Sequence, residues 1–155
     1  MTLLSLTIAF AVFTNGLLAG ISFDTSLVKL PARRKIGNVA YAVFARGNDL
    51  GRGVIVYSAL AITAGLLVIA STIIALIQKM TDDLLLLLII TSITTIIHFI
   101  GTAKAAPVML SIKNTSDDES ILKNKFDKFE RWHDFRTCFQ VITFLILLYV
   151  FFIVE

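Results

Sequence analysis

The chain has 155 residues, of which 57% are hydrophobic and 16% are charged, and its formal net charge is +3. Soluble domains are close to half apolar and a quarter charged, and a water-soluble fold of this length could not hide so much apolar surface. The composition therefore excludes a soluble globular domain and predicts an all-α integral membrane protein.

Four long apolar runs set the domain organisation. They cover residues 3–23, 54–77, 84–103 and 137–154. Each run is close to the roughly 20 residues that a helix needs to cross a hydrocarbon core of ~30 Å. The first run lacks the basic flank and the small-residue cleavage site of a signal peptide, so we expect it to remain as the first span. The sequence thus predicts a single domain, residues 1–155, folded as a membrane four-helix bundle.

The stretch between the first two runs predicts a short interfacial helix. Pro31 suits the first turn of a helix, apolar residues recur after it at helical spacing, and Gly47 marks the expected end. Basic residues beside an apolar face are typical of a helix that lies at the membrane surface. Arg46, Asp49 and Arg52 crowd the approach to the second run, and we include them among the candidate ligand-binding residues.

The stretch before the fourth run predicts a long helix that extends into the cytoplasm. Ser116 and Glu119 have the spacing of a capping box, which indicates a helix start. Aromatic residues then follow every three or four positions from Phe126 to Phe139. We expect one unbroken helix over residues 117–154, with this aromatic stripe packed on the first loop.

The basic residues predict the orientation, because Lys and Arg beside membrane spans are retained in the cytoplasm. They gather in the loop after the first run and in the loop after the third, whereas the short loop between the second and third runs holds Lys79 with Asp82 and Asp83. We therefore expect a cell-membrane protein with both termini outside and two cytoplasmic basic loops. These loops favour anionic lipid headgroups as partners, at about 1 kcal/mol per nearby basic residue, and imply no nucleic acid.

Several polar residues fall at similar depths in the spans. Asp24, Arg52, Lys104 and Arg136 lie near the inner boundary. A rise of 1.5 Å per residue places His98 roughly 9 Å deeper than Lys104. Such groups usually face the bundle interior and often mark function, so we expect an inward-opening polar pocket. The candidate ligand-binding residues are Asp24, Arg46, Asp49, Arg52, Lys104, Trp132 and Gln140.

The same polar residues have structural alternatives. The basic side chains could reach lipid headgroups, and Asp24 could pair with one of them. Asn15 and Gln140 could instead hydrogen-bond between helices. The sequence alone leaves these alternatives open.

His98, His133 and Arg136 are the candidate catalytic residues. A neutral histidine can accept or donate a proton near pH 7, and an arginine can stabilise developing negative charge. The single Cys and two His do not supply the ligands of a zinc or iron–sulfur site. We therefore expect no metal and no cofactor.

Residues 129–137 read FERWHDFRT and lead into the last run. This segment resembles the ending of the anthrone-oxygenase-like family of small four-span membrane proteins. The landmarks that also fit are Gly16, Gly20, Pro31, residues 41–47, Ala106-Pro107 and Lys113-Asn114. The resemblance covers nearly the whole chain, and its most specific part is Trp132-His133-x-x-Arg136-Thr137. Most members have no assigned activity; the resemblance implies, for a minority, oxidation of anthrones by O₂ without evident metal or flavin.

Three functions remain open from the sequence. The first is a protein that binds a small apolar or aromatic ligand, or that serves as an accessory subunit of a membrane complex or homo-oligomer. The second is a cofactor-independent oxygenase in which His98 or His133 removes a proton and Arg or Lys stabilises the resulting anion. The third is a small-solute carrier, which is disfavoured because the sequence has no internal repeat.

Overall fold

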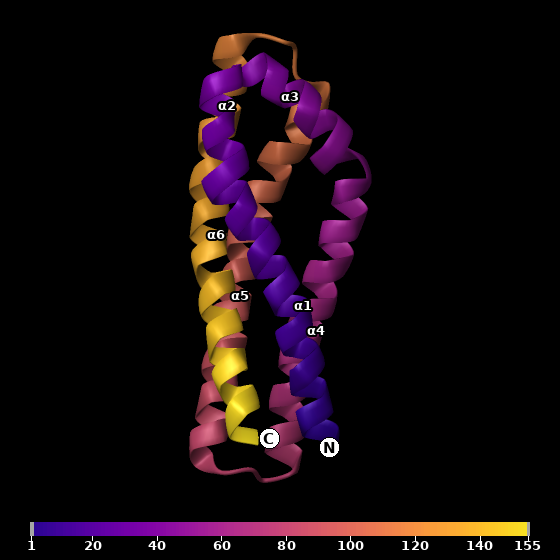
Figure 1. Ribbon diagram of the computed structural model, residues 1–155, viewed down its shortest axis with the longest axis vertical. Helices are drawn as coiled ribbons and strands as arrows, with labels where there is room; N and C mark the ends of the chain where they lie inside the picture. Colours follow the sequence, from indigo (N-terminus) through magenta and orange to yellow (C-terminus); the bar gives the residue numbers. More distant parts are fainter. Residues whose placement is uncertain (1, 155) are drawn as a thin grey trace.

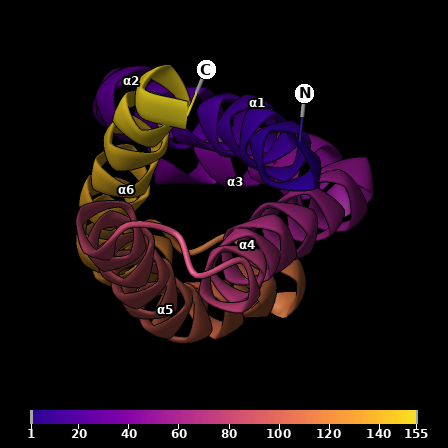
Figure 2. The same ribbon diagram turned by 90° about the horizontal axis from the view of Figure 1, so that it is seen from below.

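The computed structural model describes residues 2–154, and all regular secondary structure in this part of the chain is helical. The long helices are α1 (Leu3–Asp24), α4 (Val54–Ile77), α5 (Asp82–Ser111) and α6 (Glu119–Val154). They run up and down in turn as a four-helix bundle (Figure 1), and the view along the bundle shows them in the cyclic order α1, α4, α5, α6 (Figure 2). The predicted all-α four-helix bundle is confirmed.

Each of the four apolar runs lies in one long helix. Within residues 2–154, four helical segments are long and apolar enough to cross a membrane. Helix α4 coincides with the predicted second span, and α1 ends at Asp24, one residue beyond the first. Helix α5 passes the expected end at residue 103 and continues through Pro107 to Ser111. By length and composition, this is a multi-pass membrane protein.

The first loop forms two short helices where we expected one. They are α2 (Leu30–Ile36) and α3 (Asn38–Gly47), and the π-helical segments η1 (Thr25–Lys29) and η2 (Asn48–Gly53) connect them to α1 and α4. The predicted end at Gly47 is confirmed, but Gly37 interrupts the helix with φ 89° and ψ 156°. This left-handed backbone favours glycine and stops a regular helix, which explains the correction.

Helix α6 is unbroken to Val154, as predicted, but its cap differs from the expected capping box. The Asp118 carboxylate accepts hydrogen bonds from the backbone N–H groups of Ser120 and Ile121 at 2.8 and 2.9 Å. Asp118 therefore takes the N-cap position that we assigned to Ser116. The Glu119 carboxylate instead caps α3, because it accepts from the backbone N–H groups of Asn38 and Val39.

Two apolar clusters stand at opposite ends of the bundle. At the loop end, Phe126 and Phe129 of α6 pack with residues of α2, α3 and α5, which confirms the predicted contact of the aromatic stripe with the first loop. The members at the other end, near the termini, are Leu4, Ile8, Ala75, Leu84, Leu88 and Val150. Asn15, His98, Arg136 and Gln140 lie between these two clusters along their helices.

Helix α4 is packed over only part of its length. Its buried residues begin at Ala64, and none of residues 54–63 is buried. At Gly65 the ring of Phe99 on α5 comes so close that an added Cβ would lie 2.6 Å from it. The start of α4 therefore stands away from the bundle beside η2, at the upper right of Figure 1. This leaves space among the four spans near the loop end.

Candidate functional site

A cavity of about 180 Å³ occupies the space that the start of α4 leaves. All four spans line it. Its lining residues include Leu18 and Ser22 from α1, Tyr57 and Ala61 from α4, His98 and Thr102 from α5, and His133 and Arg136 from α6. The volume is comparable to an engineered cavity of ~150 Å³ that binds benzene, and it is below the ~300 Å³ of small drug pockets. The cavity therefore has room for about one aromatic ring.

The cavity reaches the outside of the bundle between α4 and α5. Ser58 of α4 and Leu110 of α5 both line it and are exposed. The surface beside this opening is apolar, with Ile55 73% exposed. The sequence led us to expect a pocket that opens inward. The exposed lining residues on α4 and α5 indicate a sideways opening between these two helices.

His133 uses both of its ring nitrogens within the protein. Nε2 lies 3.2 Å from the carbonyl oxygen of Ser22, which can only accept, so Nε2 carries the proton. Nδ1 then accepts hydrogen bonds from Nε and Nη2 of Arg136 at 3.1 and 2.9 Å. With both nitrogens engaged, His133 holds Arg136 in place and keeps no free lone pair for a proton.

His98 has one free lone pair. Its Nδ1 lies 3.1 Å from the carbonyl oxygen of Arg136, so Nδ1 donates and Nε2 is unprotonated. The hydroxyl of Thr102 lies 3.4 Å from Nε2 but donates its proton to the His98 carbonyl at 3.0 Å. Of the two histidines on the cavity wall, His98 is therefore the one that could accept a proton.

Arg136 brings a positive charge to the cavity. Besides His133, it contacts the Thr102 hydroxyl through Nη1 at 3.4 Å. Within residues 2–154, no carboxylate lies within the 4.0 Å of an ion pair with it. Asp24, an expected alternative partner of a basic residue at this level, pairs with Lys29 at 3.4 Å.

The structure separates the sequence-predicted site residues into two groups. His98, His133, Arg136 and Asp49 line the cavity, with Asp49 at its loop end on η2. The candidates that do not line it are Asp24, Arg46, Arg52, Lys104, Trp132 and Gln140. Depth along the helices placed Asp24, Arg52, Lys104 and Arg136 at similar levels, but Arg136 lines the cavity and the other three do not.

The residues outside the cavity have other contacts. Arg46 forms an ion pair with Asp117 at 2.7 Å and donates to the carbonyl of Thr115. These two contacts hold α3 against the connection between α5 and α6. Gln140 is 2% exposed and donates to the Asn15 side chain at 2.9 Å, as in the hydrogen-bonding alternative. Trp132 packs against the loop-end cluster. Arg52 and Lys104 are exposed.

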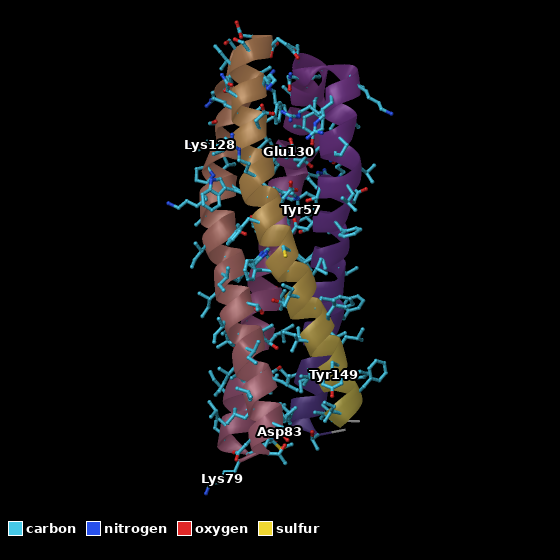
Figure 3. All side chains as sticks on the ribbon, turned by 90° about the vertical axis from the view of Figure 1, so that its left-hand side faces the viewer. Tyr57, Lys79, Asp83, Lys128, Glu130 and Tyr149 are labelled. Atoms are coloured by element: carbon cyan, nitrogen blue, oxygen red, sulfur yellow. The ribbon has the colours of Figure 1, made fainter. Side chains whose placement is uncertain are left out.

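Sequence reasoning missed Tyr57, Ser58 and Ala61 on the cavity wall. The sequence offers a weak signal for them, because Tyr57 and Ala61 share one helix face and Ser58 adjoins it, but small residues also occur around them. Figure 3 places Tyr57 below Glu130 along the bundle axis, on the way from the loop end towards Tyr149. Tyr57 and Ser58 are residues with hydroxyl groups on the α4 side of the cavity.

Across residues 2–154, no group of three His, Cys, Asp or Glu side chains is arranged to hold a metal ion. The residues that line the cavity offer a free imidazole lone pair, a guanidinium, hydroxyl groups and apolar walls. No family model matches this chain, and no curated protein or solved structure matches it.

Proposed function

We propose that this membrane protein binds a small apolar or aromatic ligand in the cavity between its four spans. The observation that carries the proposal is an internal space bordered by His98, His133 and Arg136. Polar and charged groups are costly inside a span, and those that face an internal cavity commonly mark a ligand site. The apolar walls and the opening between α4 and α5 suit a ligand that arrives from the membrane.

The proposed orientation places the cavity in the cytoplasmic half of the bilayer. The loops at its end of the bundle carry most of the basic residues, which favours the cytoplasm for that end. In Figure 3, Lys128 and Glu130 lie towards this end, whereas Lys79 and Asp83 lie at the other. Both termini would then be outside the cell, and the ligand would enter from the inner leaflet.

Native mass spectrometry with ligand extraction tests the binding proposal. Protein purified gently from its own membrane should carry a small aromatic or quinone-like molecule that dissociates on activation. Reproducible partner subunits without any small molecule would contradict it and favour an accessory role in a membrane complex.

The free lone pair of His98 favours a second candidate, a cofactor-independent oxygenase of the anthrone type. Nε2 of His98 would take the acidic C–H proton of the substrate, and Arg136 would stabilise the resulting oxyanion. The carbanion would add O₂ to form a C–O bond and a peroxide anion, which takes the proton back from His98. Loss of water from this hydroperoxide would give the quinone. A three-ring anthrone exceeds about one ring of space, so part of it would protrude between α4 and α5.

Oxygen uptake in the presence of an anthrone tests this second candidate. Removal of a general base commonly lowers a rate by about 10²- to 10⁴-fold, so His98→Gln should reduce the enzyme-dependent rate by at least ~100-fold. Arg131→Gln alters an exposed arginine of α6 that does not line the cavity, and it should leave the rate unchanged. An unchanged rate in His98→Gln would remove His98 from the chemistry.

A further inference from the structure

Arg136 keeps hydrogen-bonding capacity that the protein does not use. A guanidinium has five N–H donors. Nε and one N–H of Nη2 go to Nδ1 of His133, and one N–H of Nη1 goes to the Thr102 hydroxyl. Within residues 2–154, one N–H of Nη1 and one N–H of Nη2 remain without an acceptor.

The positive charge of Arg136 is also uncompensated. His133 is uncharged in the tautomer that its contacts require, and Thr102 is neutral. Asp49 is the one carboxylate among the residues that line the cavity, but it stands at the loop end, more than 4.0 Å from any nitrogen of Arg136, and accepts from Asn48 at 3.0 Å. An unpaired charge beside apolar walls is unfavourable, so this site favours an anion.

The order of the lining residues indicates how such an anion would lie. Arg136 and His98 stand at the deep end with Ala61, whereas Phe129 and Leu110 stand nearer the loops. Phe129 precedes Arg136 by seven residues, so the lined length of α6 is roughly 10 Å. A ligand with its anionic group at Arg136 would place its apolar part against Phe129 and towards the opening at Leu110.

We infer that the cavity selects a carboxylate on a small apolar or aromatic body, held by the free N–H groups of Arg136. Guanidinium and carboxylate form paired, charge-assisted N–H···O bonds, and two donors on neighbouring nitrogens fit the two oxygens. His133 acts as a positioning residue, because its Nδ1 accepts from Nε and Nη2 of Arg136 and so fixes the guanidinium. The inference rests on the proposed ligand-binding function and adds the ligand's chemical class.

A matched pair of probes tests the inference in the detergent-solubilised protein. 4-Fluorobenzoate and 4-fluorobenzamide have nearly the same shape and differ in charge, and ¹⁹F NMR line broadening reports the binding of each. The wild-type protein should bind the carboxylate at least tenfold more tightly than the amide. Arg136→Gln should abolish this preference, whereas Arg131→Gln should retain it.

Other outcomes separate failure of the inference from failure of the proposed function. Equal binding of the two probes by the wild-type protein would overturn carboxylate selection, and this comparison needs no variant to fold. Ala61→Phe fills the cavity from α4 and should abolish binding of the carboxylate, whereas the neighbouring Ala59→Phe, exposed on the outside of α4, should not. Binding of neither probe, or binding that Ala61→Phe leaves intact, would contradict the cavity as a ligand site.

Discussion

Arg33 is a charged side chain that is only 3% exposed. Its Nη2 pairs with Asp127 at 2.8 Å and with Glu130 at 2.7 Å, and its guanidinium lies 5.4 Å from the centre of the Phe126 ring. These contacts hold α2 against α6. The sequence presents Arg33 as one member of a basic run at the membrane surface, so its role in packing became evident only from the structure.

Replacement of Arg33 should destabilise the fold. Arg33→Ala leaves two carboxylates without their buried partner; because both carboxylates retain some contact with water, we expect a loss of about 2 kcal/mol in the free energy of unfolding. Arg34→Ala is the matched control, because Arg34 is 67% exposed and its pair with Glu130 should contribute below ~1 kcal/mol. Unfolding of both variants in detergent, followed by circular dichroism, gives the comparison. Equal losses would contradict the buried role of Arg33.

Asp118 should make the start of α6 sensitive to acid. Hydrogen bonds from the Ser120 hydroxyl and from the backbone N–H groups of Ile121 and Ser120 lower the pKa of the Asp118 carboxyl. A lowered folded pKa means that the stabilisation is complete above the unfolded value of about 3.9 and is lost as the pH falls through the folded pKa.

Asp118→Asn isolates this effect, because asparagine is also a good N-cap but does not titrate in this range. Thermal melts between about pH 5 and pH 2 should show that the wild-type protein loses more stability than Asp118→Asn. Parallel losses in the two proteins would show that Asp118 contributes nothing to the acid response.

At the scale of elements, close contact between α5 and α6 positions the site. A Cβ at Gly101 of α5 would lie 2.8 Å from Cβ of Arg136 and 3.3 Å from its Cα. Gly101 therefore lets α6 approach closely enough for the Arg136 carbonyl to accept from His98. The backbone contact of the two helices sets the position of both side chains.

Gly101→Ala should push α6 away from α5. We expect a loss of about 1–3 kcal/mol from overpacking, together with weaker ligand binding. Gly20→Ala is the control, because an added Cβ there meets nothing within 4 Å and alanine is a better helix former. Thermal unfolding and ligand retention measured on both variants test this, and a Gly101→Ala protein with wild-type stability would contradict it.

The sequence predicted the long elements well and their junctions less well. Apolar runs of span length and the aromatic periodicity of α6 are strong local signals, and the structure confirms them. The cap at Asp118 is local, but the start of α3 after Gly37 depends on a contact between loops that are distant in sequence. Glu119, for example, caps α3 across more than seventy residues. Local patterns contain no information on such pairs.

At the scale of the whole molecule, local sequence patterns also do not determine which residues meet at the candidate site. Depth in the spans selected His98 and Arg136, which line one cavity, but it also selected Lys104 and Gln140, which do not. The distinction requires the rotation of each helix and the divergence of α4, which arises from packing among all four spans. Which histidine keeps a free lone pair also depended on carbonyl groups of neighbouring helices.

The orientation of the whole molecule yields a labelling prediction. In a Cys138→Ser background, Met80→Cys should react with a membrane-impermeant thiol reagent added outside intact cells, because its loop carries few basic residues. Ser116→Cys, in the connection between α5 and α6, should react only after the cells are opened. The reverse pattern would overturn the proposed orientation.

The central claim is that the cavity between the four spans holds a ligand, and native mass spectrometry of two matched variants tests it most directly. Ala61→Phe projects a ring into the cavity from α4, whereas Ala59→Phe adds the same ring on the outer face of that helix. We predict that the wild-type protein and Ala59→Phe carry the same small-molecule adduct and that Ala61→Phe lacks it. An adduct that persists in Ala61→Phe, or its absence from the wild-type protein, would contradict the claim.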